Sequence, residues 1–190
     1  MSRADNMKEK IIQITIECLE QDDGKIDDIT IRYIADKAHV GIGLINYHFG
    51  TKEKLIEICV QRIIEQVINV FRPNISEQVD EIERLKEVVK QVADFLIENP
   101  KISKISILAD MASPTIMDNT SRTVLGFMST LKDSKIDKSQ QLLLTYCLTF
   151  VLQAMFLRKD ISIELLQLDY NKKEDRDRFI DFIIERLYIS

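Results

Sequence analysis

The chain has 190 residues, of which 45% are hydrophobic and 30% charged, an ordinary balance for a globular protein. Glycine and proline together make 8 of the 190 residues, about 4%, against roughly 12% of an average chain, so a β-sandwich or barrel with its many turns is disfavoured and long helices are favoured. The formal net charge of −5 excludes a protein that coats nucleic acid over its whole surface, but not one with a local DNA-binding face.

Hydrophobic periodicity predicts an all-α protein of about nine helices. Thr30, Thr51 and Asp137 are good N-caps, while Asn99-Pro100 and Ser113-Pro114 each indicate a cap followed by proline at the first helical position. Pro73 ends the fourth helix. The predicted helices span residues 5–20, 31–37, 42–49, 51–70, 76–98, 100–111, 114–132, 137–158 and 174–188.

The cysteine and N-terminal patterns favour a cytoplasmic protein. Cys18, Cys59 and Cys147 lack metal-ligand spacing, and their odd number cannot form a disulfide framework, so we expect reduced thiols and no metal. No signal peptide, membrane-spanning segment or cofactor site is expected.

Residues 30–49 are typical of two short helices joined by a tight turn, the arrangement that places a second helix in the major groove of DNA. Leu44, Ile45 and Phe49 share the inward face of the second helix, whereas Asn46 and Tyr47 lie towards the other side. This segment is therefore predicted to bind double-stranded DNA.

The outward residues suit base and phosphate contacts. Asparagine reads adenine through two hydrogen bonds, isoleucine can contact a thymine methyl group, and glycine lets the backbone approach closely. Phosphates can be held by tyrosine, histidine, lysine and backbone N–H groups. The candidate DNA-binding residues are Thr30, Arg32, Gly41, Ile42, Gly43, Asn46, Tyr47, His48 and Lys52.

Simpler interpretations stay open for several charged residues. Arg32 could pair with Asp28 or Asp36, and His48 could be a hydrogen-bonded structural histidine. Lys37 and Lys54 fit a solvated surface equally well. Residues 29–54 carry four Lys/Arg against two Asp/Glu, a local balance of only +2, so phosphate contacts are expected mainly through neutral donors.

The same segment resembles the DNA-binding domain of the tetracycline-repressor (TetR) family of bacterial regulators. The resemblance covers roughly residues 8–55, and the remaining 135 residues match only in being helical and apolar. Its matching positions are Thr30, Ile31, Arg32, Ile34, Ala35, Ala38, Val40, Gly43, Ile45, Tyr47, His48, Phe49, Lys52, Lys54 and Leu55.

The sequence departs from the family pattern at three positions. His39 stands in the turn where the family usually has glycine, Gly41 where it often has serine or threonine, and Asn46 where it often has an aromatic residue. Because that turn often needs a left-handed backbone, we expect His39 to adopt one at a modest cost.

The resemblance implies an N-terminal helix-turn-helix domain over residues 1–55 and a helical ligand-binding and dimerisation domain over residues 56–190, linked by the helix 52–70. It further implies a phosphate contact for His48.

Residues 140–157 are apolar on nearly every side, which favours burial against a second copy, although a central helix of a monomer is the alternative. In proteins that this region resembles, the last two long helices form a four-helix dimer bundle. The candidate interface residues are Thr145, Thr149, Val151, Ala154, Phe179, Ile183 and Leu187.

A pocket for a small, mainly apolar effector is expected in the C-terminal domain, since no charge cluster there indicates an ionic ligand. For each candidate residue taken singly, a place in the plain core is the stronger interpretation. The candidates are Phe95, Met111, Met117, Phe127, Met128, Tyr146 and Phe150, which are soft or aromatic.

These features predict a homodimeric transcriptional repressor that a ligand releases from a palindromic operator, with the gating implied by the resemblance alone. One alternative is an architectural or cell-division factor of the same fold without an effector. A helical enzyme is the distant alternative, because residues 56–190 contain no histidine for nucleophile activation or a histidine-based metal site. No catalytic residue is therefore proposed.

Overall fold

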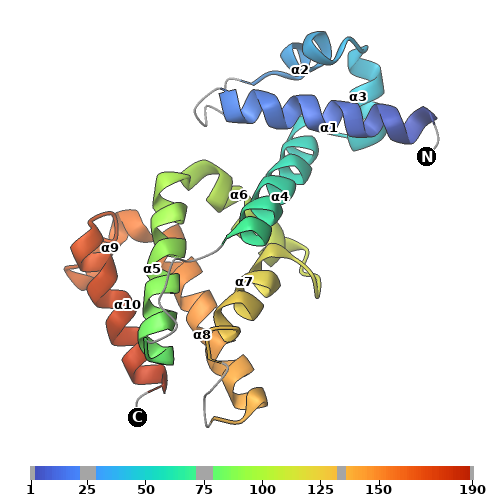
Figure 1. Ribbon diagram of the computed structural model, residues 1–190. Coiled ribbons are helices and arrows are strands. Elements are labelled where there is room, and N and C mark those ends of the chain that lie inside the picture. Colours follow the sequence, from blue (N-terminus) through green and yellow to red (C-terminus); the bar gives the residue numbers. More distant parts are fainter. Residues whose placement is uncertain (1–2, 22–28, 72–78, 132–135, 189–190) are drawn as a thin grey trace. The chain divides into compact units, whose positions relative to one another are not determined.

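The computed structural model describes residues 3–21, 29–71, 79–131 and 136–188, and these contain helices and no strands. Asp28, Pro73, Ser76 and Lys132, which bear on predictions above, lie outside the described residues. The all-α prediction is confirmed (Figure 1). The helices are α1 (Arg3–Gln21), α2 (Ile31–Ala38), α3 (Ile42–Phe49), α4 (Lys52–Val70), α5 (Glu81–Glu98), α6 (Pro100–Ala112), α7 (Asn119–Met128), α8 (Lys138–Leu157), α9 (Lys159–Leu166) and α10 (Lys173–Tyr188).

Most of the predicted helix ends are correct because their caps are local. Thr30 accepts a hydrogen bond from the Tyr33 N–H (3.1 Å), and Thr51 accepts one from the Lys54 N–H (3.1 Å). The Asp137 carboxylate caps α8 by accepting from the Ser139 and Gln140 N–H groups. Pro100 is the first residue of α6, as expected.

Three predictions about the helices were wrong. Helix α7 begins at Asn119 rather than Pro114, because the Asp118 carboxylate accepts from the Ser121 N–H (2.8 Å) and supplies the cap. Helix α5 begins only at Glu81, after the capping residue Asp80. The short helix α9 was not predicted, since its residues lack an amphipathic period.

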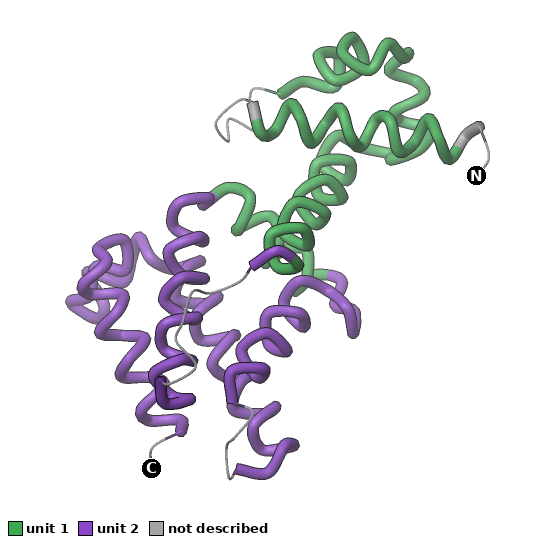
Figure 2. The backbone as a smooth tube through the Cα atoms, in the orientation of Figure 1, with its two compact units in different colours: residues 1–69, 101–112 green, residues 70–100, 113–190 purple. Residues whose placement is uncertain are grey.

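The chain divides into two compact units (Figure 2). Unit 1 comprises residues 1–69 and 101–112, and unit 2 comprises residues 70–100 and 113–190. Helix α6 thus groups with the N-terminal helices although it follows α5 in sequence. The predicted boundary near residue 55 stays a prediction.

In unit 1, side chains of α4 bind both α1 and α6 through hydrogen bonds. The Arg62 guanidinium binds the Glu9 carboxylate of α1 with two hydrogen bonds (2.6 and 2.9 Å), and this contact lowers the pKa of Glu9. On α6, the Asp110 carboxylate accepts from the Gln61 side-chain amide (2.8 Å), and the Ser106 hydroxyl donates back to the Gln61 amide oxygen (3.3 Å). The linking helix is therefore fixed to both α1 and α6.

Unit 2 has an apolar core formed by α5, α7, α8 and α10. Each of these helices contributes fully or almost fully buried side chains, which exclude water from the centre of the unit. The core residues are Leu85, Val88, Val89, Ala93, Phe127, Leu131, Leu148, Leu152, Ile180 and Ile184.

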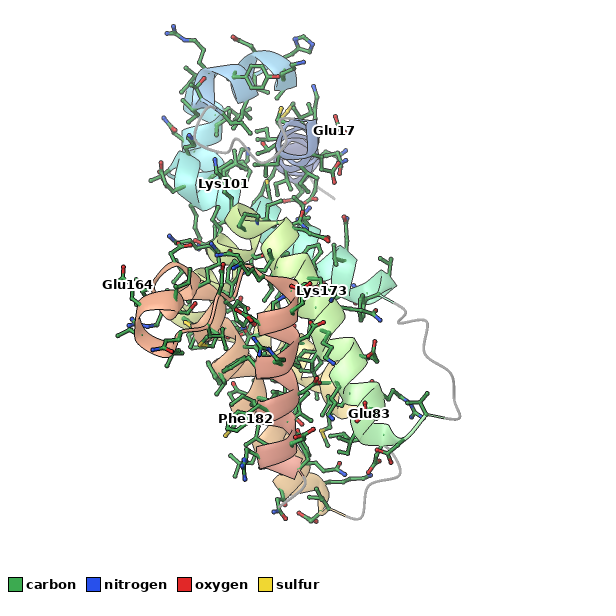
Figure 3. The ribbon with its side chains drawn as sticks, turned by 90° about the vertical axis from the view of Figure 1, so that its left-hand side faces the viewer. Glu17, Glu83, Lys101, Glu164, Lys173 and Phe182 are labelled. Atoms are coloured by element: carbon green, nitrogen blue, oxygen red, sulfur yellow. The ribbon has the colours of Figure 1, made fainter. Side chains whose placement is uncertain are left out.

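Beside this core, α5 and α10 are joined by a row of three ion pairs, here called the ion-pair ladder. It consists of Lys86–Glu185 (3.0 Å), Lys90–Asp181 (2.8 Å) and Asp94–Arg176. Arg176 is buried and also donates to the Tyr170 and Asn171 carbonyl oxygens. Lys173, at the seam between α10 and α5 in Figure 3, adds a second cation to Asp94 (2.8 Å).

The ladder makes the stability of unit 2 dependent on pH. Burial disfavours the Asp94 carboxylate, but hydrogen bonds from Arg176 and Lys173 outweigh it and lower the pKa of Asp94. A carboxyl group with a lowered pKa stabilises the fold above its unfolded pKa of about 4, and this stabilisation is lost as the pH falls through its folded value.

We expect Asp94→Asn to lower the free energy of unfolding at pH 7 by about 2–3 kcal/mol, because it leaves the buried Arg176 guanidinium without its carboxylate. The variant should also lose less stability than the unchanged protein between pH 5 and pH 3. Urea unfolding at pH 7, 5 and 3 measures both effects.

Asp160→Asn is the matched control. Asp160 pairs with Lys159 (2.8 Å), but its side chain is 81% exposed, so this variant should lose less than about 0.5 kcal/mol of the free energy of unfolding. Equal losses in the two variants would contradict this account of the ladder.

Candidate nucleic-acid interface

The candidate interface is carried by α2, α3 and the turn between them. Ile34, Ala35 and Ala38 on α2 are buried, as are Ile45 and Phe49 on α3. The two helices therefore share one core with α1, and their remaining faces are left to solvent.

The turn depends on a left-handed residue. His39 has φ 55° and ψ 48°, as the sequence predicted. Its N–H donates to the Asp36 carbonyl (3.2 Å), and the next N–H, of Val40, donates to the Ala35 carbonyl (3.0 Å). This pairing closes α2 and sets the direction in which α3 begins.

All nine candidate DNA-binding residues lie at the surface of unit 1. Tyr47 is 81% exposed, and Asn46 beside it is also exposed. Gly41 and Gly43 are exposed at the start of α3, and Thr30 and Arg32 are exposed at the start of α2. Ile42, His48 and Lys52 are half-buried.

The two glycines of α3 are not required by the fold of the chain. A Cβ atom placed on Gly41 or Gly43 would meet no atom within 4 Å, and neither residue has a positive φ. Gly43 lies within α3, where glycine costs about 0.5–1 kcal/mol relative to alanine, whereas Gly41 is the N-cap, a position that tolerates glycine. The missing side chain of Gly43 is thus unexplained inside the protein, and both glycines leave the start of α3 open to close approach from outside.

Several side chains around α3 also have partners within the chain. The His48 ring lies 5.1 Å from the Tyr47 ring and 6.0 Å from the Phe49 ring, which suits a structural as well as a contact role. Lys54 pairs with Glu57. The Lys37 ammonium lies 5.6 Å from the centre of the Tyr33 ring.

Sequence reasoning passed over Tyr33. This exposed tyrosine lies on α2, and its ring is close to one cation, the Lys37 ammonium. The available signal was an aromatic residue at a solvent-facing helical position, which is unusual where no contact is made.

A second surface, here called the α8 face, lies on unit 2. It comprises apolar side chains between 39% and 63% exposed, together with the exposed thiol of Cys147. The apolar residues of the α8 face are Leu142, Leu143, Tyr146 and Phe150 on α8, and Phe182 on α10.

The polar stripe of α8 points the other way. Gln141, Thr145, Thr149 and Gln153 are all buried inside unit 2. The threonine hydroxyls donate to carbonyl oxygens four residues earlier (2.7 and 2.9 Å), while Gln141 donates to the Leu131 carbonyl (3.3 Å). Helix α8 thus turns its polar stripe inwards and its apolar face outwards.

The residues predicted to form the dimer interface fall into two groups, one buried within its own chain and one at least partly exposed. Thr145 and Thr149 are buried within their own chain and are not part of an exposed surface. Ala154 is exposed, and the remaining four are half-buried: Val151, Phe179, Ile183 and Leu187.

The candidate pocket residues differ in burial, and one of them belongs to unit 1, so the pocket stays a prediction. Phe127 is a core residue, Phe95 and Met128 are half-buried, and Met117 is exposed in the segment before α7. Met111 belongs to unit 1 and is also exposed. Tyr146 and Phe150 are part of the α8 face, with ring centroids 5.0 Å apart.

Among the described helices, α8 alone is long and apolar enough to cross a membrane by length and composition. The core helix of a globular bundle meets the same criteria, and α8 packs against α5, α7 and α10. The described residues contain no cluster of His, Cys, Asp and Glu suited to a metal ion.

Comparison with known proteins confirms the resemblance seen in the sequence. Residues 25–59 match the family model described as bacterial regulatory proteins, tetR family. These residues contain α2, α3, the turn between them and the start of α4, which is the candidate interface.

Curated relatives match a longer stretch. The nucleoid occlusion factor SlmA of Vibrio atlanticus (strain LGP32) is 25% identical over 104 residues, which are 55% of this chain and 53% of the relative. The SlmA protein of Vibrio cholerae is 26% identical over 100 residues, or 53% and 50% of the two chains. The chain thus spans about half the length of the curated relatives it matches.

Solved structures share the whole fold. A TetR transcriptional regulator from Rhodococcus sp. RHA1 has a TM-score of 0.60 at 13% identity, covering 100% of this chain and 98% of that one. A tetR-family transcriptional regulator from Streptomyces coelicolor has a TM-score of 0.57 at 14% identity, covering 100% and 90%. The chain therefore has the fold of these solved regulators, and residues 25–59 match the family model.

Proposed function

We propose that this chain, which carries the DNA-binding segment of the tetR family within the fold of TetR-type DNA-binding regulators, is a homodimeric repressor that a small ligand releases from a palindromic operator. The observation that carries the proposal is the surface of α3. This helix buries Ile45 and Phe49 and exposes Gly43, Asn46 and Tyr47 next to a cap geometry that fixes its direction.

In this proposal α3 enters the major groove and the start of α2 lies along the backbone. Asn46 reads an adenine edge, Ile42 contacts a thymine methyl group, and Tyr47 contacts a phosphate. Gly41 and Gly43 let the helix approach the DNA closely. Thr30, Arg32, His48 and Lys52 are proposed to hold phosphates.

A dimer is supported by the α8 face. A single recognition helix covers only a few base pairs, whereas two copies about 34 Å apart read both halves of a palindrome. The outward apolar side chains of α8 and α10 have no cover within the described chain, and a second copy would provide one.

The proposed release acts through α4. Because α4 is hydrogen-bonded to α6 through Gln61 and to α1 through Arg62, a shift of α6 would be passed to the DNA-binding helices. We propose a small, mainly apolar effector in the C-terminal region, on the strength of the family resemblance. Such an effector works only by binding the non-DNA-binding state more tightly.

A second candidate is a DNA-bound factor without a small-molecule effector. It is favoured by the similarity to proteins named nucleoid occlusion factor, which extends over 104 residues and so beyond the 35 residues (25–59) of the family model. A thermal-shift screen distinguishes the two functions, because a ligand that raises the melting temperature and also weakens DNA binding supports the effector-released repressor.

We expect Gly43→Ala to stabilise the protein by about 0.5–1 kcal/mol and yet to weaken operator binding at least tenfold. Alanine favours the helix and meets no atom of the chain, but its methyl group would stand between α3 and DNA. Gel-shift titration against DNA flanking the gene, together with urea unfolding, measures the two effects.

The same titration includes the double variant Asn46→Ala, Tyr47→Ala, which should abolish specific binding while leaving stability within about 0.5 kcal/mol, since both residues are exposed. The control is Gln13→Ala on the exposed side of α1, which should bind as the unchanged protein does. If the unchanged protein binds a palindromic fragment and the double variant binds it equally well, α3 is not the reading helix.

We expect dimerisation to protect Cys147 from alkylation. Cys18 and Cys59 are buried, and burial raises the pKa of Cys59 to about 12, so Cys147 is the thiol that a maleimide should reach first. Its labelling rate should fall as the protein concentration rises through the dimer dissociation constant. Phe150→Glu, on the exposed side of the same helix, should restore fast labelling at every concentration. A rate independent of concentration in the unchanged protein would argue against the α8 face as the interface.

A further inference from the structure

Helix α9 leaves four large aliphatic side chains exposed to solvent, half of its eight residues. Of its eight residues only Ser162 is buried, with its hydroxyl 2.7 Å from the carbonyl oxygens of Lys159 and Leu168. A serine therefore fixes α9 to its own unit. Its exposed aliphatic residues, between 40% and 67% exposed, are Ile161, Ile163, Leu165 and Leu166.

These side chains continue the α8 face along the sequence. Arg158 ends α8 and also precedes α9, and its carbonyl accepts the Ile161 N–H (3.1 Å), so the second helix follows the first without a loop. Within α8, neighbours three or four residues apart share a helix face, and Leu143, Tyr146, Phe150 and Ala154 are exposed at such intervals. The exposed aliphatic residues of α9 begin at Ile161, three residues after α8 ends at Arg158.

The area of the α8 face indicates that it is incomplete by itself. A stable interface buries about 800 Å² per partner. Since a fully exposed large apolar side chain offers roughly 200 Å², the five apolar residues of the α8 face, about half exposed, present on the order of 500 Å². The four aliphatic residues of α9 add roughly 400 Å² on the same scale, which brings the apolar surface to the size of a stable interface.

The charges around α9 fit the rim of such an interface. Arg158, Asp160 and Glu164 are exposed at its edges, so both signs of charge border the apolar residues. A two-fold interface pairs each residue with a different one on the partner, so a rim of both signs can be complementary to itself. In Figure 3, Glu164 of α9 and Phe182 of the α8 face lie towards the same side of unit 2, and Glu83 of α5 lies towards the other.

We infer that α9 is part of the self-association surface, and that a second copy of this chain covers Ile161, Leu165 and Leu166 together with the α8 face. This inference rests on the dimer of the proposed function and extends it to a helix that the sequence did not predict. The partner is a second copy because α9 directly follows α8 in the chain and its aliphatic residues supply the area that the α8 face lacks.

The test is sedimentation equilibrium of the full chain and of Leu165→Glu. Because Leu165 is 67% exposed, the variant should fold normally, with unchanged helicity by circular dichroism and an unchanged melting temperature under monomeric conditions. Its dimer dissociation constant should rise by about 30-fold or more, since a charge would be buried against the apolar surface of the partner. The matched control is Glu164→Gln, a change at the adjoining rim position, which should alter the constant by less than about threefold.

Hydrogen exchange provides a second measurement. Amides of residues 159–166 in the unchanged protein should exchange more slowly above the dissociation constant than below it. If the protein dimerises but Leu165→Glu has the same dissociation constant and α9 exchanges at one rate throughout, then α9 is not part of the interface and the α8 dimer stands. If the unchanged protein is monomeric at every concentration, both this inference and the proposed dimer are overturned.

Discussion

Helix α8 needs hydrogen-bond partners for the polar groups on one side and cover from water for the apolar side chains on the other. The packing of the C-terminal half of the molecule depends on these two needs. Its inward side carries a polar stripe whose hydroxyl and amide groups find carbonyl partners within unit 2, such as the Gln141–Leu131 hydrogen bond. Its outward side carries leucine, tyrosine and phenylalanine, which a monomer would leave in water. The proposed self-association would bury this outward side as well, and the proposed palindromic operator has the same two-fold symmetry.

The N-terminal half was predictable from the sequence because its decisive interactions are local. Thr30 caps α2 three residues ahead, His39 closes it in the left-handed conformation, and the spacing of Ile45 and Phe49 fixes the inward face of α3. The buried face of α1 followed from the same periodicity, since Ile11, Ile12 and Leu19 are all buried. Each of these features depends on residues fewer than nine positions apart.

The remaining differences arise where packing between helices decides, or where the sequence offers two local alternatives. A narrow polar stripe on α8 is ordinarily assigned to solvent, but here the threonine hydroxyls bond to their own helix and free that side for burial. The grouping of α6 with unit 1 depends on Gln61, Ser106 and Asp110, residues more than 40 positions apart. No local pattern shows which of two possible caps begins α7, and Asp118 prevails over Ser113 because its carboxylate also accepts from the Thr115 N–H (2.9 Å).

The order of charges in the ion-pair ladder specifies the register in which α5 and α10 pack against each other. Along α5 the signs run plus, plus, minus at Lys86, Lys90 and Asp94, and α10 presents the complement in the reverse direction. If α10 slid by one helical turn, Asp94 would face Asp181 in one direction, and Lys90 would approach Arg176 in the other. Like charges at these partly buried positions repel, so the ladder resists the one-turn slippage that some switching proteins use. Sliding of helices within unit 2 is therefore expected at helix pairs other than α5 and α10, where no such row of ion pairs fixes the register.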